Sequence, residues 1–210
     1  MTQDEDPFES AYRTQAPDGS VVAAAGWDTG EPQPVVVELE RDGWIRGDVL
    51  DAGCGTGENA LYVAERGYSV TGVDAAPSAI AHARAKADRR GIGVDFAVAD
   101  VLDLAGYAGR FDTVIDSGVF HVFSDEDQAR YLAALHTACR PDAVAYFLTF
   151  SDRQPGEWGP RRMTEREIRD SFGDGWVLAG LRRATMAADL PEEGRQDIRA
   201  WLATARLVSR

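Results

Sequence analysis

The stretch that decides the fold is Asp51-Ala52-Gly53-Cys54-Gly55-Thr56-Gly57. It follows the apolar pair Val49-Leu50 and leads into the apolar run 59–64, so it predicts a strand, a glycine turn and the start of a helix. Glycine tolerates positive φ and lets a ligand approach the backbone closely. The start of a helix adds backbone N–H groups that lack an internal partner. The stretch therefore predicts a ligand-binding turn at the end of a buried strand.

An acid follows the next apolar run. Residues 68–73 end on Asp74, about 20 residues after the glycine turn, where an acid can hold both hydroxyls of a ribose. The dinucleotide fingerprint G-x-G-x-x-G, counted from Gly53, requires a glycine where this chain has Glu58. We expect that carboxylate to repel a pyrophosphate, whereas Asp51 favours a ligand that carries positive charge.

The run Asp51-x-Gly53-x-Gly55-x-Gly57 resembles the first motif of the class I S-adenosylmethionine-dependent methyltransferases, and Asp74 matches their ribose-binding acid. S-adenosylmethionine carries an ammonium and a sulfonium and no phosphate, in agreement with the charge argument. The resemblance covers the chain from residue 46 to its end. It implies a cofactor site formed by these residues: Trp27, Asp51, Gly53, Cys54, Gly55, Gly57, Asp74, Ala75, Asp100, Val101 and Asp116.

Two of these acids follow later strands. Asp100, with Val101 after it, follows the expected strand 94–98, where the family has an acid that binds the adenine amino group. A helix cap or loop position is the alternative. Asp116 ends the expected strand 113–116, in a segment that resembles the fourth family motif. It is expected to line the methionine part of the cofactor, because ligands bind at the carboxyl ends of strands in open α/β sheets. The alternative is a capped strand end.

His121 lies just after this motif, in the loop nearest to where the transferred methyl group would point. Imidazole titrates near neutral pH, so His121 is the candidate general base. Packing or fixing of the loop is the alternative. The loop after the fifth strand carries Arg153 and Trp158, which together with Phe120 are expected to contact the acceptor. A solvated loop with ion pairs is the alternative for the arginines.

Trp27 begins the segment Trp27-Asp28-Thr29-Gly30. This segment resembles one that precedes the core in thiopurine, thiol and halide methyltransferases and in related bacterial heterocycle or quinone methyltransferases. The resemblance implies that Trp27 covers the sulfonium or the acceptor, as part of an extension that folds over the site. The alternative is a tryptophan that anchors the extension to the core.

Strands and helices alternate along the chain, which predicts a parallel sheet with helices on both faces. The resemblance adds a late antiparallel strand pair. The predicted fold is α/β, a Rossmann-like doubly wound, mostly parallel seven-stranded sheet, with an N-terminal lid at 1–45 before a methyltransferase domain at 46–210. The expected strands are 47–51, 69–73, 94–98, 113–116, 144–149, 177–181 and 201–208, with a turn-rich segment between the last two. The expected helices are 34–41, 57–66, 77–90 and 125–139, and a capping box at Thr164–Glu167 opens a short one.

Composition limits the partners. The chain has 210 residues and a net charge of −13, which predicts one domain and disfavours nucleic acid and anionic lipid. Its two cysteines, Cys54 and Cys139, predict no disulfide framework and no zinc site. The absence of a signal peptide and of a long apolar run favours a cytoplasmic protein without membrane contact. Lys86, the single lysine among many arginines, indicates a GC-rich bacterial genome.

The expected activity is metal-independent transfer of a methyl group from S-adenosylmethionine to an oxygen, nitrogen or sulfur atom of a small aromatic or heterocyclic molecule. The expected assembly is a monomer or homodimer. Two alternatives stay open at this point. One is an NAD-dependent oxidoreductase on a Rossmann fold, and the other is a protein that binds S-adenosylmethionine without catalysis.

Overall fold

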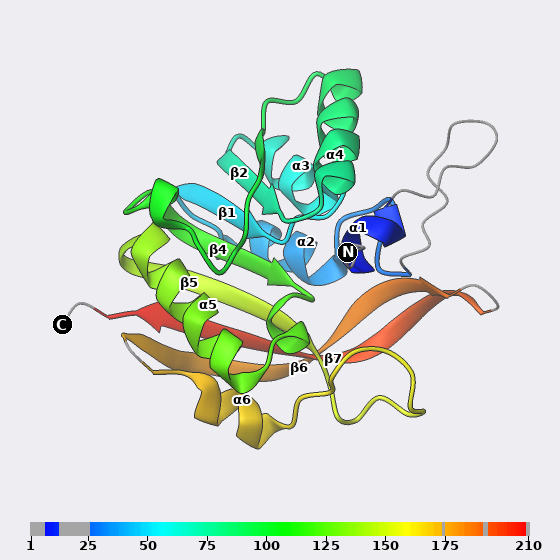
Figure 1. The fold of residues 1–210 in the computed structure, drawn as a ribbon, viewed down its shortest axis with the longest axis vertical. Coiled ribbons are helices and arrows are strands. Elements are labelled where there is room, and N and C mark those ends of the chain that lie inside the picture. Colours follow the sequence, from blue (N-terminus) through cyan, green and yellow to red (C-terminus); the bar gives the residue numbers. More distant parts are fainter. Residues whose placement is uncertain (1–6, 13–25, 174, 191–192, 209–210) are drawn as a thin grey trace, which may run out of the picture.

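The computed structural model describes residues 7–12, 26–173, 175–190 and 193–208. Its centre is a seven-stranded sheet in the order β3-β2-β1-β4-β5-β7-β6 (Figure 1). The strands are β1 (Asp48–Ala52), β2 (Ser69–Asp74), β3 (Asp95–Val98), β4 (Phe111–Ser117), β5 (Cys139–Phe150), β6 (Trp176–Leu190) and β7 (Gly194–Leu207). Strands β1 to β5 pair in parallel, and β7 runs antiparallel to both of its neighbours. The predicted mostly parallel sheet with a late antiparallel pair is confirmed.

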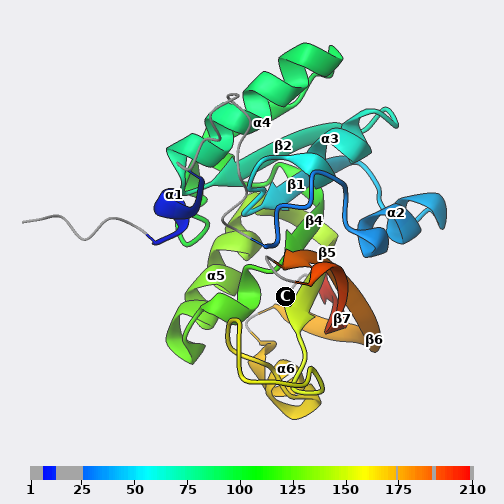
Figure 2. The same cartoon turned by 90° about the vertical axis from the view of Figure 1, so that its right-hand side faces the viewer.

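Helices cover both faces of the sheet, as Figure 2 shows from the side. On one face, α2 (Pro34–Arg41), α3 (Glu58–Ala64) and α4 (Pro77–Arg90) contribute buried side chains to a core with β1, β2 and the hairpin β6–β7. On the other face, α5 (Asp125–Ala138) and α6 (Glu165–Ser171) pack on β4, β5 and β7. The Thr164–Glu167 capping box is present at the start of α6, as predicted.

The strand order reverses between β1 and β4, which places the expected ligand crevice where these two strands end. The loops that follow them are in contact. A Cβ on Gly53, after β1, would lie 2.2 Å from Cγ2 of Val119, after β4. Glycine at position 53 therefore allows the two loops to close against each other at the crevice.

The last two strands are longer than predicted. The prediction of short strands at 177–181 and 201–208 with a turn-rich segment between them is wrong, because β6 and β7 pair along their whole length up to Leu190 and Gly194. Residues 182–189 lack the apolar alternation typical of an isolated strand, and their pairing with β7 makes them one. Pro191, expected in the turn-rich segment, lies outside the described residues. The far end of this hairpin extends past the core sheet, on the side of the view where α1 (Pro7–Tyr12) also lies (Figure 1).

Candidate active site

The glycine turn after β1 requires its glycines. Gly53, Gly55 and Gly57 have φ of 70°, 53° and 87°, which are left-handed values that favour glycine. A Cβ on Gly57 would lie 2.6 Å from the Phe96 ring, so packing also excludes a side chain there. The N–H groups of Gly53 and Cys54 donate to the Val73 carbonyl and join the turn to β2. The turn is therefore a rigid backbone surface at the crevice.

Asp74 ends β2 beside this turn. Its Oδ2 accepts the Gly55 N–H at 2.8 Å, and its Oδ1 accepts the Ala76 N–H at 2.9 Å. A carboxylate oxygen accepts up to two hydrogen bonds, so this anchoring is compatible with a ribose held on the same group. The acid predicted for the ribose therefore also fixes the glycine turn that it faces.

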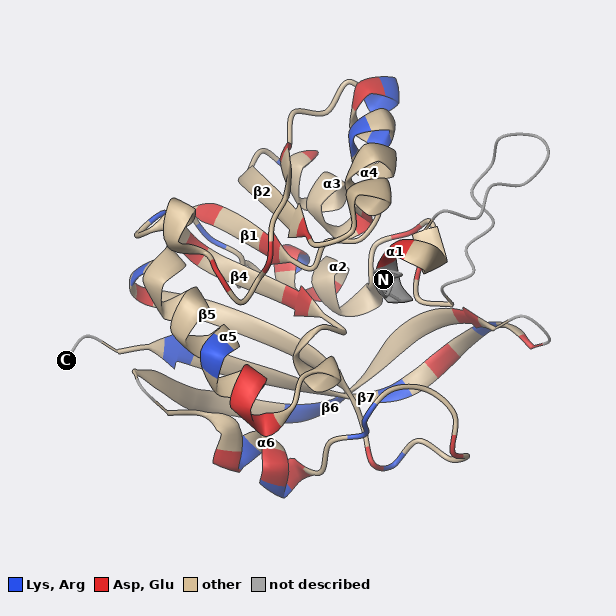
Figure 3. Cartoon of the chain, viewed as in Figure 1, with Lys and Arg blue, Asp and Glu red and all other residues tan. Residues whose placement is uncertain are grey.

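Asp51 is a buried carboxyl group at the end of β1. Its pKa is raised to about 7, chiefly by burial and further by the charges of Asp74 and Asp116, against a hydrogen bond from the Ala60 N–H. Its Oδ2 has no hydrogen-bond partner among the described residues. Figure 3 shows acidic positions where the central strands end. A cationic ligand at this point would compensate the negative charge of ionised Asp51.

The acids after β3 and β4 hold turns. Both oxygens of Asp116 accept backbone N–H groups of Val119 and Phe120 at 3.0–3.3 Å, and its carboxyl group is buried. Burial is the main cause that raises the pKa of Asp116 to about 7. Asp100 is exposed and accepts the Leu102 N–H at 2.9 Å. The geometry favours a turn-forming role for Asp116 over direct contact with a cofactor, and it leaves the adenine contact of Asp100 as a prediction.

Glu58 does not present an unpaired charge. Its carboxylate pairs with Lys86 at 2.8 Å and with Arg90 at 3.0 Å. The predicted repulsion of a pyrophosphate by a bare carboxylate therefore needs correction, because two cations compensate this group. What remains against a dinucleotide is the volume of a side chain at the position that the fingerprint reserves for glycine.

His121 lies in the short 3-10 helix Phe120–Val122 that follows β4, and its side chain is buried. Its Nδ1 accepts the backbone N–H of Phe150, at the end of β5, at 3.1 Å. Burial lowers the pKa of His121 to about 4, so the ring is neutral at physiological pH. The loop after β4 is thereby tied to the next strand through one ring nitrogen.

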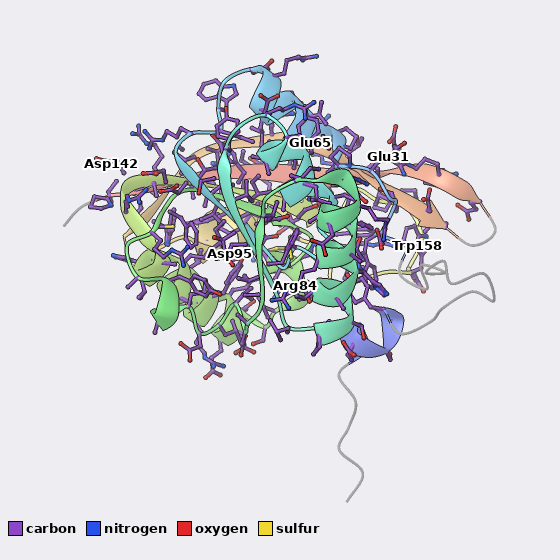
Figure 4. The ribbon with its side chains drawn as sticks, turned by 90° about the horizontal axis from the view of Figure 1, so that it is seen from above. Glu31, Glu65, Arg84, Asp95, Asp142 and Trp158 are labelled. Carbon is purple, nitrogen blue, oxygen red and sulfur yellow. The ribbon has the colours of Figure 1, made fainter. Side chains whose placement is uncertain are left out.

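Apolar and aromatic residues form a connected group with this histidine. A Cβ on Gly118 would lie 3.7 Å from Cε1 of His121 and 3.6 Å from Cε of Met186, on β6. The rings of His121 and Phe150 are 5.9 Å apart, and Trp158 meets Phe150 edge-on at 5.6 Å. We call Gly118, His121, Phe150, Trp158 and Met186 the acceptor cluster. Figure 4 shows Trp158 at the end of the molecule opposite Asp142, which lies near the amino end of β5.

Two of the residues expected at the acceptor are elsewhere. Phe120 is fully buried in the core, where it stacks on Phe172 at 6.0 Å and packs against Phe147. The expectation that Phe120 contacts the acceptor is therefore not supported. The Arg153 guanidinium lies over the Trp201 ring at 5.4 Å, outside the acceptor cluster.

The N-terminal segment lies against the glycine turn. The Trp27 indole N–H donates to the Tyr12 hydroxyl at 2.8 Å, and a Cβ on Gly55 would lie 2.9 Å from that hydroxyl. Thr56, in the turn, donates to Asp28 at 2.9 Å and accepts from Lys86 at 2.6 Å. Residues from the extension thus touch the turn at two places, and Tyr12 is a contact that no sequence motif indicated.

The same segment is held by the far end of the β6–β7 hairpin. The Gln33 side chain makes two hydrogen bonds with the Ala187 backbone, at 3.0 and 2.8 Å. The Asp189 N–H donates to the Gly26 carbonyl at 2.6 Å. The long hairpin therefore supports the N-terminal segment and carries Met186 into the acceptor cluster. Neither contact was predicted, because the residues are about 150 positions apart in sequence.

The rest of the described structure offers no second candidate for the active site. A shallow hollow at the amino ends of the strands is lined by Asp48, Thr71 and Arg140, and Arg140 is already paired with Asp48 at 2.8 Å. Within the described residues, no three histidine, cysteine or acidic side chains gather as metal ligands. No helix in the same part of the chain is long and apolar enough to cross a membrane. Cys54 and Cys139 are buried free thiols.

The residues at the crevice fit S-adenosylmethionine. Asp51 has a buried oxygen without a partner in the described part of the chain, which suits a cation, the glycine turn exposes backbone free of side chains, and the Asp74 carboxylate lies beside that turn. With the seven-stranded sheet, this arrangement defines a class: the chain belongs to the class I S-adenosylmethionine-dependent methyltransferases. It is an enzyme that methylates small molecules, with S-adenosylmethionine as its cofactor.

Comparisons with known proteins establish this membership. Residues 49–142 match the methyltransferase domain family. The chain is 40% identical over 201 residues to the 2-heptyl-1-hydroxyquinolin-4(1H)-one methyltransferase of Mycobacteroides abscessus. The aligned residues cover 94% of this chain and 87% of the relative. A structure from work on the conversion of a disulfide bond into a thioacetal group during echinomycin biosynthesis superposes with a TM-score of 0.87 and 42% identity, over 96% of this chain and 92% of that one.

A third similar protein has a crystal structure with bound ligands. The 1,6-didemethyltoxoflavin-N1-methyltransferase of Burkholderia thailandensis, with bound 1,6-didemethyltoxoflavin and S-adenosylhomocysteine, has a TM-score of 0.64 and 28% identity, and the match covers 84% of this chain and 77% of that one. The shared fold and the demethylated form of the cofactor in that structure agree with the cofactor assigned to this chain. An NAD-dependent oxidoreductase and a non-catalytic binding protein are set aside by this family membership.

Proposed function

We propose that this enzyme methylates an oxygen or nitrogen atom of a flat heteroaromatic molecule, without a metal ion. The acceptor cluster carries the proposal, because its one polar ring, His121, packs on Phe150, and the other members, Trp158 and Met186, are aromatic or apolar. Such a site suits a planar, mostly apolar molecule with one polar group that fixes its orientation. The hydroxyquinolone and toxoflavin relatives act on heterocycles, which supports the same class of acceptor.

When bound, the cofactor supplies a methyl group on a sulfonium that is already a good leaving group. The chain must therefore bind, align and exclude water rather than activate a leaving group. In this proposal Asp51 and Asp74 hold the cofactor, with Asp100 beside its adenine. The aromatic side chains of the acceptor cluster hold the ring of the acceptor against the end of β4.

We further propose that residues 1–45 act as a lid. Trp27 and Asp28 reach the glycine turn through Tyr12 and Thr56, and the hairpin end holds the same segment from the other side. A cover made of separate segments excludes water from the transfer and opens for exchange of ligands. An acidic chain with a net charge of −13 supports a small-molecule acceptor over nucleic acid.

A sulfur acceptor is the second candidate, because the structure from echinomycin biosynthesis is 42% identical and concerns sulfur chemistry. A thiolate needs no hydrogen-bond donor or base beside it. The two candidates therefore differ in how much they depend on His121.

The test is a panel of acceptors incubated with the purified enzyme and S-adenosylmethionine, with and without EDTA. The panel contains N-hydroxyquinolones, hydroxyquinolines, ring N–H heterocycles, quinols and thiols, and mass spectrometry identifies the methylated atom. The proposal expects transfer to the oxygen or nitrogen of heteroaromatic members, unchanged by EDTA. Transfer confined to thiols would select the second candidate, and loss of transfer in EDTA would remove metal independence.

A further inference from the structure

We propose that His121 is a fixed hydrogen-bond donor to an oxygen of the acceptor, and that the acceptor ionises before transfer instead of giving its proton to the enzyme. This inference rests on the proposed function and narrows it. It replaces the general base expected from the sequence with a group that holds the acceptor. It also specifies the chemistry of the acceptor, because a site without a base must receive an acidic nucleophile.

The backbone of β5 sets the state of the ring. The Phe150 N–H can only donate, and it donates to Nδ1 of His121 at 3.1 Å. Nδ1 must therefore be unprotonated, so a neutral ring carries its single proton on Nε2. The nitrogen with a basic lone pair is thus occupied by the protein, and the other nitrogen is a donor.

The donor nitrogen is left unused by the protein within the described residues. Nε2 makes no hydrogen bond within the described residues. It is also not fully enclosed by them, so a ligand atom can approach it. The adjacent ring carbon, Cε1, lies 3.7 Å from the Cβ position of Gly118, at the carboxyl end of β4. Gly118, Phe150 and Met186 around the ring carry no charge, so nothing in the acceptor cluster favours an imidazolium. An acceptor oxygen that binds beside Nε2 would therefore meet a neutral N–H donor near the carboxyl end of β4.

The transfer balances without a proton on the enzyme. The acceptor loses its proton to water before it binds, and a lone pair of the resulting anion forms the new bond to the methyl carbon. The bond between that carbon and the sulfonium sulfur breaks, and its electron pair stays on sulfur. His121 Nε2–H donates to a neighbouring oxygen of the acceptor throughout, so it orients the nucleophile and takes no proton.

The acceptor class follows from this arrangement. It is a planar heteroaromatic compound whose O–H or ring N–H ionises near or below neutral pH, and which carries an oxygen able to accept a hydrogen bond beside the methylated atom. Weakly acidic phenols and alcohols of the same shape are expected to react slowly, because no residue in this site removes their proton.

Nuclear magnetic resonance of the enzyme labelled with ¹⁵N-histidine tests the ring directly, without any acceptor. The three histidines, His82, His121 and His136, are assigned through their Gln variants. The proposal expects His121 to show the neutral form protonated at Nε2, with no titration between pH 5.5 and 9. A proton on Nδ1, or titration near pH 6.5, would overturn it.

Two matched variants separate donor, base and structural roles. His121→Gln places an amide N–H₂ near the position of Nε2, whereas His121→Asn places an amide oxygen near Nδ1, where it can accept the Phe150 N–H. A donor role predicts that Gln keeps kcat/KM within about tenfold while Asn loses about 100-fold. A base role predicts that both lose about 10²–10⁴-fold, and a structural role predicts that Asn is the more active and the more stable of the two. Thermal unfolding of both variants identifies losses that come from misfolding.

The pH profile of kcat/KM gives the third readout. For acceptors of one shape but graded acidity, the acid limb is expected to move with the pKa of the acceptor. A limb that stays at one pH for all of them would show a base on the enzyme and would contradict the inference. If no heteroaromatic acceptor is methylated at all, the proposed function fails, while the tautomer of His121 is still decided by the resonance measurement.

Discussion

The two halves of the site are built in different ways. The cofactor half comes from consecutive elements, β1, the glycine turn and β2, and much of it is backbone held by Asp74. The acceptor half combines side chains from the ends of β4 and β5 and the loops after them with Met186 of the β6–β7 hairpin. The first half is short-range in sequence and rigid, and the second depends on distant segments. Substitutions are therefore expected to have larger effects in the first half.

The largest effect is expected from Gly53→Ala. The new Cβ would lie 2.2 Å from Cγ2 of Val119, and the alanine would have to keep a φ of 70°. The cost of backbone strain therefore adds to the cost of steric overlap. We expect a loss of stability of about 2–5 kcal/mol and no measurable affinity for S-adenosylmethionine. Urea unfolding and calorimetry measure the two quantities.

Gly91→Ala is the matched control. Its φ is 66°, but no atom lies within 4 Å of the added Cβ, so it carries the backbone strain without the overlap. It is expected to cost about 1–2 kcal/mol of stability and to leave cofactor affinity unchanged. Equal behaviour of the two variants would show that contact between the β1 and β4 loops does not matter for binding.

Asp74→Ala is expected to weaken S-adenosylmethionine by about 10–100-fold, because it removes the ribose acceptor and the group that holds the Gly55 N–H. Asp74→Asn keeps one acceptor oxygen and should lose less. Calorimetry on both variants, with circular dichroism to confirm folding, measures the difference. Unchanged affinity in folded Asp74→Ala would remove the ribose assignment.

Asp51 links binding to pH. Its pKa is about 7 in the folded chain, whereas the pKa of an ordinary aspartate, expected in the unfolded chain, is 3.8. A raised acid pKa contributes stability that is complete below about pH 4 and is lost as pH rises to about 7. Relative to Asp51→Asn, the cofactor-free enzyme should therefore lose stability across this window, on the order of 1–3 kcal/mol.

Cofactor affinity should move in the opposite direction. An ammonium ligand favours ionised Asp51, so affinity of the unmodified enzyme should rise by about tenfold between pH 5.5 and 7.5. Affinity of Asp51→Asn should be weaker at pH 7.5 and nearly independent of pH. Calorimetry at several pH values measures both proteins, and parallel profiles would exclude Asp51 as the cation-binding group.

The same contrast explains what the sequence revealed. The glycine turn, Asp74 and the strand alternation are local patterns, so they predicted the doubly wound fold and a glycine turn between its first strand and the helix that follows. Phe120 was misplaced because adjacent residues of a 3-10 helix point to different sides, and nothing in the local sequence told which side faces the core. Tyr12 and Met186 were missed because each reaches the site through contacts between distant segments.

The length of the β6–β7 hairpin was underestimated for the same reason. Arg182 and Arg183 give little strand signal, and only pairing with β7 makes their segment extended. The tautomer of His121 also depends on a long-range contact, the Phe150 N–H, which is 29 residues away. Sequence patterns thus predicted the fold but not the direction in which the side chains point.

The smallest effect is expected at the contact between Tyr12 and Trp27, which links the extension to the cofactor half. Tyr12→Phe and Trp27→Phe each remove one partner of the 2.8 Å hydrogen bond and keep an aromatic ring. Each substitution should weaken the affinity for S-adenosylmethionine by a few-fold. The double variant should lose no more affinity than the single variant with the larger loss, which corresponds to a coupling free energy of about 0.5–1.5 kcal/mol. Burial raises the pKa of Tyr12, so the hydroxyl keeps its proton and the coupling should not change between pH 6 and 9. Calorimetry on the four proteins measures the cycle. Strictly additive losses would mean that the two residues act separately on the cofactor and that their hydrogen bond does not hold the lid closed.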